Sequence, residues 1–257
     1  MVREGGLVLT SDSLILRGQH IVAITAGNQR EKATVLASDA NSGVAILRIG
    51  QSNLTPASLI AASNITPGQL AIAVTCKRSP ESLDIAVGRI TQISQHASLQ
   101  GGSVLIDTLS ADAPVSTGAA GGLLLNGNGH VIAILDAVQH EGPNAVDIGT
   151  PAEIATTVAS ELMTRGKVVH GWLGIEGHNA PAPATGAIIT AVGPNSPAAN
   201  AGLHPGDIIE AVNGISVSSM AALQGQLYLL PPKVPVVLEI DHGGVTTDVK
   251  VVLSANQ

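Results

Sequence analysis

The 257-residue sequence is 45% hydrophobic and 12% charged, with a formal net charge of -7 and a pI near 5.5. The chain has no surplus of basic residues, and it contains no Phe, one Trp and one Tyr. We therefore expect that it does not bind nucleic acid. The single Cys76 excludes an internal disulfide and a Cys-rich zinc site, and no H-E-x-x-H spacing occurs, so we expect no metal and no other cofactor.

Short apolar runs separated by polar turns fill the N-terminal part of the chain. The length is sufficient for two ordinary domains, and 29 Gly and 14 Pro favour short strands over long helices. Run length and β-branching predict strands at residues 7–9, 21–24, 33–36, 44–49, 67–74, 85–91 and 105–108.

A glycine-rich turn, Gly118-Ala119-Ala120-Gly121-Gly122, follows these strands. After it, an Asn-Gly turn at residues 126–129 is predicted to join two further strands as a hairpin. Residues 152–165 have helical spacing, with apolar residues on one face, and Gly166 is placed to end that helix.

The pattern changes after Lys167 and predicts a second module. Its longest motif is Ser-Pro-Ala-Ala at residues 196–199, followed by Ala-Gly-Leu-His-Pro-Gly-Asp at 201–207 and Val-Asn-Gly at 212–214. Residues 217–230 have helical spacing and are followed by Pro231-Pro232, which ends the helix. Apolar and polar residues alternate over 234–240 and 245–253, which predicts two closing strands.

Several of these stretches resemble the HtrA/Deg trypsin-like serine proteases with a C-terminal PDZ domain. Residues 118–126 resemble the family's nucleophile loop G-N-S-G-G-P-L-V-N, and residues 6–15 resemble G-Y-V-L-T-N-A-H-V-V. Residues 171–175 resemble the G-W-L-G-V start of the PDZ domain. The resemblance implies a fold dominated by β-strands: a chymotrypsin-like double β-barrel at 1–165, starting without the family's upstream strand, and an α+β PDZ domain at 166–257.

The same resemblance indicates that the catalytic triad is lost. It places Ser13 at the position of the catalytic His, Gly43 at that of the Asp and Ala120 at that of the nucleophilic Ser. Acyl transfer needs a nucleophile, a base and an orienting acid, and none is present at these positions. We therefore expect a pseudoprotease with no catalytic residues, in which Gly118, Ala119 and Ala120 retain a vestigial oxyanion loop.

An active serine endopeptidase with a non-standard centre is the alternative. A second register sets residues 14–22 against the same family motif and makes His20 the base, although it requires a deletion before Val35. Ser or Thr in such a turn usually bonds its own backbone, and a His beside a hairpin is usually a surface group. The residues near the loop to which this applies are Ser116, Thr117, His130 and His140.

For the PDZ module the resemblance implies peptide binding. A ligand C-terminus would add as an antiparallel strand beside Ile175, with its carboxylate held by the backbone N–H groups of Trp172, Leu173 and Gly174. A pocket favouring small or aliphatic terminal side chains is predicted to be lined by Leu173, Ile175, Met220, Leu223 and Leu227.

The sequence therefore predicts an HtrA-like scaffold, adaptor or regulator in extracytoplasmic protein quality control, binding C-termini or unfolded chains in the periplasm or cell envelope. A regulatory subunit of an active HtrA homologue is a further alternative. We expect a monomer, because the family's trimers use N-terminal aromatic residues that this chain lacks. No apolar run approaches the ~18 residues of a membrane helix and no signal peptide is present, so a membrane anchor upstream of this chain is expected.

Overall fold

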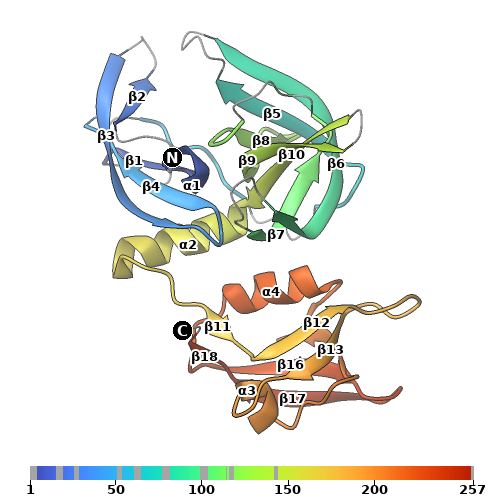
Figure 1. Ribbon diagram of the computed structural model, residues 1–257. Helices are drawn as coiled ribbons and strands as arrows, with labels where there is room; N and C mark the ends of the chain where they lie inside the picture. The colour runs from blue at the N-terminus through green and yellow to red at the C-terminus, as the bar shows by residue number, and fades with distance from the viewer. Residues whose placement is uncertain are drawn as a thin grey trace. The chain divides into compact units, whose positions relative to one another are not determined.

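The structure is a computed structural model that describes residues 5–15, 20–25, 29–50, 54–60, 65–76, 82–98, 104–113, 115, 119–141 and 144–255. The chain divides into two compact units, Met1–Val168 and Val169–Gln257 (Figure 1). Strands dominate both units, as predicted. In the described ranges, no helix is both long and apolar enough to cross a bilayer.

The first unit begins with a four-stranded antiparallel sheet, drawn in blue in Figure 1. A single helical turn, α1 (Asp12–Ile15), follows its first strand and was not predicted, because one turn has no periodicity to detect. A pair of barrels was predicted, but these strands form an open sheet within the described part of the chain. Their order is β1 (Leu7–Ser11), β4 (Val44–Arg48), β3 (Gln29–Asp39) and β2 (Ile21–Thr25).

The next six strands close into a barrel around a core of small and branched apolar side chains. The Asn126 side chain accepts the N–H groups of Asn128 and His130 (3.0 Å each), which fixes the predicted hairpin turn. The barrel order is β10 (Asn144–Pro151), β7 (Val104–Ala111), β6 (Leu83–Ser98), β5 (Leu70–Cys76), β8 (Leu123–Asn126) and β9 (Val131–Glu141).

Helix α2 (Ala152–Arg165) has the predicted bounds and contacts strands of both the sheet (β3, β4) and the barrel (β9, β10). It buries the face formed by Ile154, Val158 and Leu162. It ends at Gly166, whose φ of 71° is left-handed and whose N–H bonds the Leu162 carbonyl. Apolar spacing and a C-terminal Gly were therefore sufficient to predict this helix.

The second unit contains a sheet of five neighbouring strands, a short sixth strand paired with one of them, and two helices. Strand β12 lies at one edge of the sheet, and α4 contacts it. The sheet order is β12 (Ile175–Asn179), β13 (Ala187–Val192), β14 (Ile208–Val212), β16 (Pro235–Asp241) and β17 (Thr246–Val252), with β15 (Ile215–Ser216) beside β14. The remaining elements are β11 (Gly171–Trp172) paired with β18 (Ser254–Ala255), and α3 (Pro197–Asn200) and α4 (Met220–Tyr228).

Helix α4 is shorter than the predicted 217–230. Ser219 is its N-cap, and the Ser219 hydroxyl accepts the Ala222 N–H (3.0 Å). Val217 instead donates its N–H to the Glu210 carbonyl, so it belongs to the preceding turn. Periodicity extended the prediction past the cap because Val217 also fits the apolar face.

Candidate functional sites

Ser13 and Gly43, two of the predicted triad positions, both lie against Asp136 in the first unit. The Ser13 hydroxyl donates to the backbone carbonyl of Asp136 in β9 (3.3 Å) and bonds the Ser11 hydroxyl (2.7 Å). Gly43, in the turn between β3 and β4, accepts the N–H of Asp12 through its carbonyl (2.7 Å). These contacts bring α1, the β3–β4 turn and β9 together at one point.

The glycine-rich turn lies against the same helical turn. A Cβ atom added to Gly121 would come within 2.5 Å of both the Leu14 Cδ1 and the Thr10 Oγ1 atoms, so this approach requires Gly. Ala119 is buried and Ala120 is half-buried. The third predicted triad position, Ala120, is thus adjacent in the chain to Gly121, which approaches Leu14, the residue after Ser13.

None of the other residues considered from the sequence has a hydrogen bond to Ser13 or Asp136 among the described residues. His20 is exposed and immediately precedes β2, whose Ile21 packs in the same apolar cluster as Ile15 of α1. His130 is half-buried in the β8–β9 turn. The side chain of His140 lies outside the described residues, as do all atoms of Ser116, Thr117 and Gly118.

Asp136 is the residue that sequence reasoning missed. Its side chain is 3% exposed, and its Oδ2 atom accepts both the N–H (3.0 Å) and the hydroxyl (2.9 Å) of Thr150. Its Oδ1 atom has no partner at hydrogen-bond distance among the described residues. The only sequence signal was an acid ending the apolar run of residues 131–135.

Burial raises the pKa of Asp136 from 3.8 to about 7. The hydroxyl of Ser11 and the two groups of Thr150 act in the opposite direction and lower this pKa, while the negative charge of Asp12 raises it further. The Ser11 hydroxyl thus lies close enough to act on this carboxyl group, although no described group meets hydrogen-bond geometry at Oδ1. Burial therefore makes Asp136 keep its proton to a higher pH than an exposed aspartate does.

The Asp136 carboxylate occupies the space beside Gly43. A Cβ atom added to Gly43 would lie 2.8 Å from Oδ1 and 3.2 Å from Cγ of Asp136, and 2.9 Å from Cδ2 of Leu105. Gly43 also has a φ of 69°, a conformation that other residues adopt only with strain. Position 43 consequently has neither the room nor the backbone conformation for an acidic side chain.

In the second unit, the loop between β11 and β12 presents backbone N–H groups at the sheet edge. The Leu173 carbonyl accepts the Ala198 N–H, and the Gly174 carbonyl accepts the Gly193 N–H (2.9 Å each). Because a trans peptide holds C=O and N–H in opposite directions, the N–H groups of Gly174 and Ile175 point away from those partners. Such a loop can hold a carboxylate, and the edge strand β12 can pair with an added strand.

The predicted peptide pocket coincides with the edge of a core cluster. Leu173 and Leu223 are fully buried, at 2% and 0% exposed, so their first role is in the core. Met220 and Leu227 are also buried and belong to the same cluster, against which the half-buried Ile175 packs. Trp172, in contrast, is 40% exposed beside the loop.

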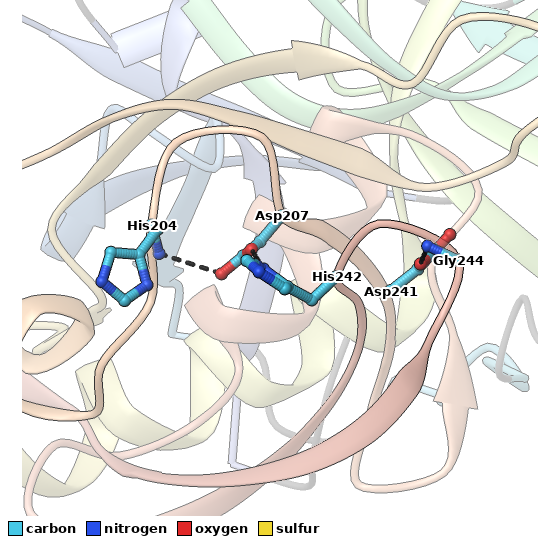
Figure 2. Close-up of polar contacts among 5 residues, drawn as sticks. All are labelled: His204, Asp207, Asp241, His242 and Gly244. Atoms are coloured by element: carbon cyan, nitrogen blue, oxygen red, sulfur yellow. Dashed lines mark hydrogen bonds and ion pairs between the residues drawn. The ribbon is translucent and has the colours of Figure 1, made fainter.

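A buried acid also binds a histidine in the second unit, as Figure 2 shows. Asp207 accepts the His204 N–H through Oδ2 (2.9 Å), and its Oδ1 atom bonds Nδ1 of His242 (2.5 Å). Among the described residues, neither imidazole bonds a hydroxyl or thiol that could act as a nucleophile, and no cluster of three or more metal-ligating side chains occurs. The pair therefore ties the loop before β14 to the β16–β17 hairpin.

Both units match known domain families. The trypsin-like peptidase domain family matches residues 1–134, and the PDZ domain family matches residues 188–241. Among curated proteins, the periplasmic pH-dependent serine endoprotease DegQ of Escherichia coli is 31% identical over 269 residues, covering 98% of this chain and 57% of DegQ. The serine endoprotease DegS of Haemophilus influenzae is 29% identical over 233 residues, covering 84% of this chain and 67% of DegS. The chain thus spans less than two thirds of DegQ.

Solved structures of similar fold cover the whole chain. The HtrA-type protease AlgW with a tripeptide superposes with a TM-score of 0.76 at 21% identity, over 100% of this chain and 88% of that one. The serine endoprotease from Yersinia pestis superposes with a TM-score of 0.64 at 25% identity, covering 100% of this chain and 88% of the Yersinia pestis chain. The predicted fold class, a trypsin-like domain followed by a PDZ domain, is confirmed by these similarities.

Proposed function

This chain belongs to the HtrA/Deg family of trypsin-like serine proteases with a PDZ domain, and from that premise we propose that it is a catalytically inactive, peptide-binding member. The observation that carries the proposal is Ala120 in the glycine-rich turn, where acyl transfer requires a hydroxyl. Its role would be that of a scaffold, adaptor or regulator in protein quality control.

The surroundings of Ser13 support the loss of catalysis. Its hydroxyl is engaged with Ser11 and with the Asp136 carbonyl, and no described imidazole takes part in this cluster. His20, the alternative base, is exposed, and its ring has no hydrogen bond to a hydroxyl among the described residues. A hydroxyl cannot replace an imidazole as a general base at neutral pH.

The edge strand β12 and the adjacent loop support peptide binding. We propose that a C-terminal peptide pairs with β12, beside Ile175, and that its carboxylate accepts the N–H groups around Gly174. The aliphatic side chains of Met220 and Leu227 on α4 would receive the terminal side chain. This arrangement favours small or aliphatic C-termini.

We further propose a cellular location and an oligomeric state. DegQ is named as periplasmic, and we propose the same extracytoplasmic location for this protein. We also propose that the chain acts as a monomer, because its sequence has no Phe with which to build an aromatic subunit contact.

The test of inactivity is cleavage of casein and labelling by a fluorophosphonate, with DegQ as the active control. We expect no cleavage and no label. Casein cleavage or probe labelling that co-purifies with the native protein would show that the protein is an active hydrolase.

The test of peptide binding is a C-terminal peptide library titrated against the full chain. Each ligand is compared with its C-terminally amidated form, which should bind at least about tenfold more weakly because the carboxylate is lost. Leu227→Ala should weaken binding, whereas Gln224→Ala, an exposed position on the same helix, should not. Equal binding of free and amidated peptides would contradict the proposed mode.

A further inference from the structure

We propose that Asp136 supplies, from β9, the buried carboxylate that the chain lacks at Gly43, so that the position of the orienting acid has moved from the β3–β4 turn to strand β9. The inference rests on the proposed correspondence between Ser13 and the family's base, and it goes beyond the loss of activity proposed above. Asp136 would be a positioning residue, since it would act only through a base at position 13.

The first argument is spatial. The Oδ1 and Cγ atoms of Asp136 lie 2.8 and 3.2 Å from the place of a Cβ atom on Gly43, so the carboxylate lies where a side chain at position 43 would begin. The backbone carbonyl of the same residue lies 3.3 Å from the Ser13 hydroxyl. Asp136 therefore contacts position 43 through its carboxylate and position 13 through its backbone carbonyl, which places it between the two positions that an orienting acid has to connect.

The second argument is the way the carboxylate is held. An orienting acid needs one oxygen fixed by the protein and one free to accept the N–H of an imidazole. Oδ2 is fixed by two hydrogen bonds from Thr150, and Oδ1 has no bonding partner among the described residues. Burial prevents water from competing for the free oxygen.

In the native chain, the charge next to Asp136 opposes the ionisation that this role requires. The acid that faces it is Asp12, whose negative charge adds to the effect of burial and favours the protonated form of Asp136. An imidazole at position 13 would reverse this balance, because an imidazolium within ~4–6 Å favours the ionised carboxylate. Two substitutions, Ser13→His and Ala120→Ser, would then complete a catalytic set without any change at Gly43.

The first experiment measures the imidazole introduced by Ser13→His, by NMR titration of the full chain. Its pKa should be higher by about one unit or more than in Ser13→His/Asp136→Asn, because only the former has a carboxylate partner. Asp147→Asn is the matched control: it removes another buried acid of the same barrel and should leave this pKa unchanged. An imidazole pKa that is the same with Asp136 and with Asn would overturn the proposal.

A second measurement needs no change at Asp136 and so does not depend on the folding of that variant. In Ser13→His alone, one ring N–H should exchange slowly with solvent and resonate downfield, as expected for a buried bond to a carboxylate. A ring whose N–H groups both exchange rapidly, in a protein with an unchanged melting temperature, would contradict the proposal.

The third experiment is fluorophosphonate labelling of Ser13→His/Ala120→Ser. Labelling should be faster than for Ala120→Ser alone, and Asp136→Asn should slow it by about 100-fold or more, in the range of acid–base effects. Labelling unaffected by Asp136→Asn would overturn this inference, whereas labelling of the native chain would overturn the proposed inactivity, so the two failures are distinct.

Discussion

Thr150 binds Asp136 twice, through its N–H and through its hydroxyl, and both contacts reach the same carboxylate oxygen. The Thr150 hydroxyl oxygen is also 2.6 Å from the Ser42 carbonyl. A hydroxyl has a single proton, so Thr150 shares it between the Asp136 carboxylate and the Ser42 carbonyl. The hydroxyl therefore compensates only part of the cost of burying the Asp136 charge, in agreement with the raised pKa of Asp136.

Thr150→Val tests this arrangement. It keeps the shape of the side chain and the N–H bond to Asp136 but removes the hydroxyl contacts to Asp136 and to the Ser42 carbonyl, so we expect a loss of about 1–3 kcal/mol in the free energy of unfolding. Thr164→Val is the control, since the exposed Thr164 hydroxyl bonds only carbonyls of its own helix. Urea unfolding measures both, and an equal loss for the two variants would contradict the assigned role of Thr150.

The first unit should become less stable as the pH rises from about 4 to 7. Burial raises the pKa of Asp136 and of Asp147 from 3.8 to about 7, and that of Asp107 to about 6. The folded state then binds more protons than the unfolded state in this window, so the free energy of unfolding falls with increasing pH. Thermal unfolding at pH 5 and pH 8 measures the difference; a higher melting temperature at pH 8 would contradict the prediction.

Asp147→Asn should remove part of that dependence. Asp147 is fully buried, and neither of its carboxylate oxygens has a hydrogen-bond partner among the described residues. Removing the charge should stabilise the protein at pH 8, on the order of 1–2 kcal/mol, and change little at pH 5. Asp248→Asn, at an exposed position, should have no effect at either pH.

Alanine substitutions at Gly43 and Gly68 distinguish the stability cost of steric crowding from the cost of backbone strain. Both have positive φ, 69° and 89°, but a Cβ atom on Gly68 would meet nothing within 4 Å. Gly68→Ala should cost about 1 kcal/mol through strain alone, whereas Gly43→Ala adds the collision with Asp136 and should cost about 2–4 kcal/mol. The midpoints of urea unfolding compare the two variants, and equal midpoints would show that the space beside Gly43 is open.

Gly174 is predicted to control peptide binding. A Cβ atom there would lie 2.3 Å from the Ser196 Cβ atom, so Gly174→Ala must displace the loop before β12. We expect at least about tenfold weaker binding of C-terminal peptides, because the N–H groups lose their directions. Gly214→Ala is the control in the same unit, with similar φ (78°) and open space; binding that is the same in both variants would exclude this loop from the site.

The sequence predicted the parts of the fold that local patterns encode. Helix α2 had both apolar spacing and a terminal Gly, and its bounds were right, whereas the cap at Ser219 shortened α4. Asp136 could not be assigned, because its contacts with Ser13 and Gly43 join segments far apart in the chain. Short motifs also left two alternatives, Ser13 and His20, for the position of the base, because two registers of the same motif fit the sequence.

Helix α2 makes the sheet and the barrel dependent on each other. Because it contacts β3 and β4 as well as β9 and β10, the two sets of strands cannot separate without exposing the apolar face of that helix to water. The sheet and the barrel should therefore melt cooperatively, as one calorimetric transition. A truncation that removed α2 would leave the sheet and the barrel joined mainly by the contacts of Ser13, Ser42 and Gly43 with β9 and β10, so that transition should become broader and lie at a lower temperature.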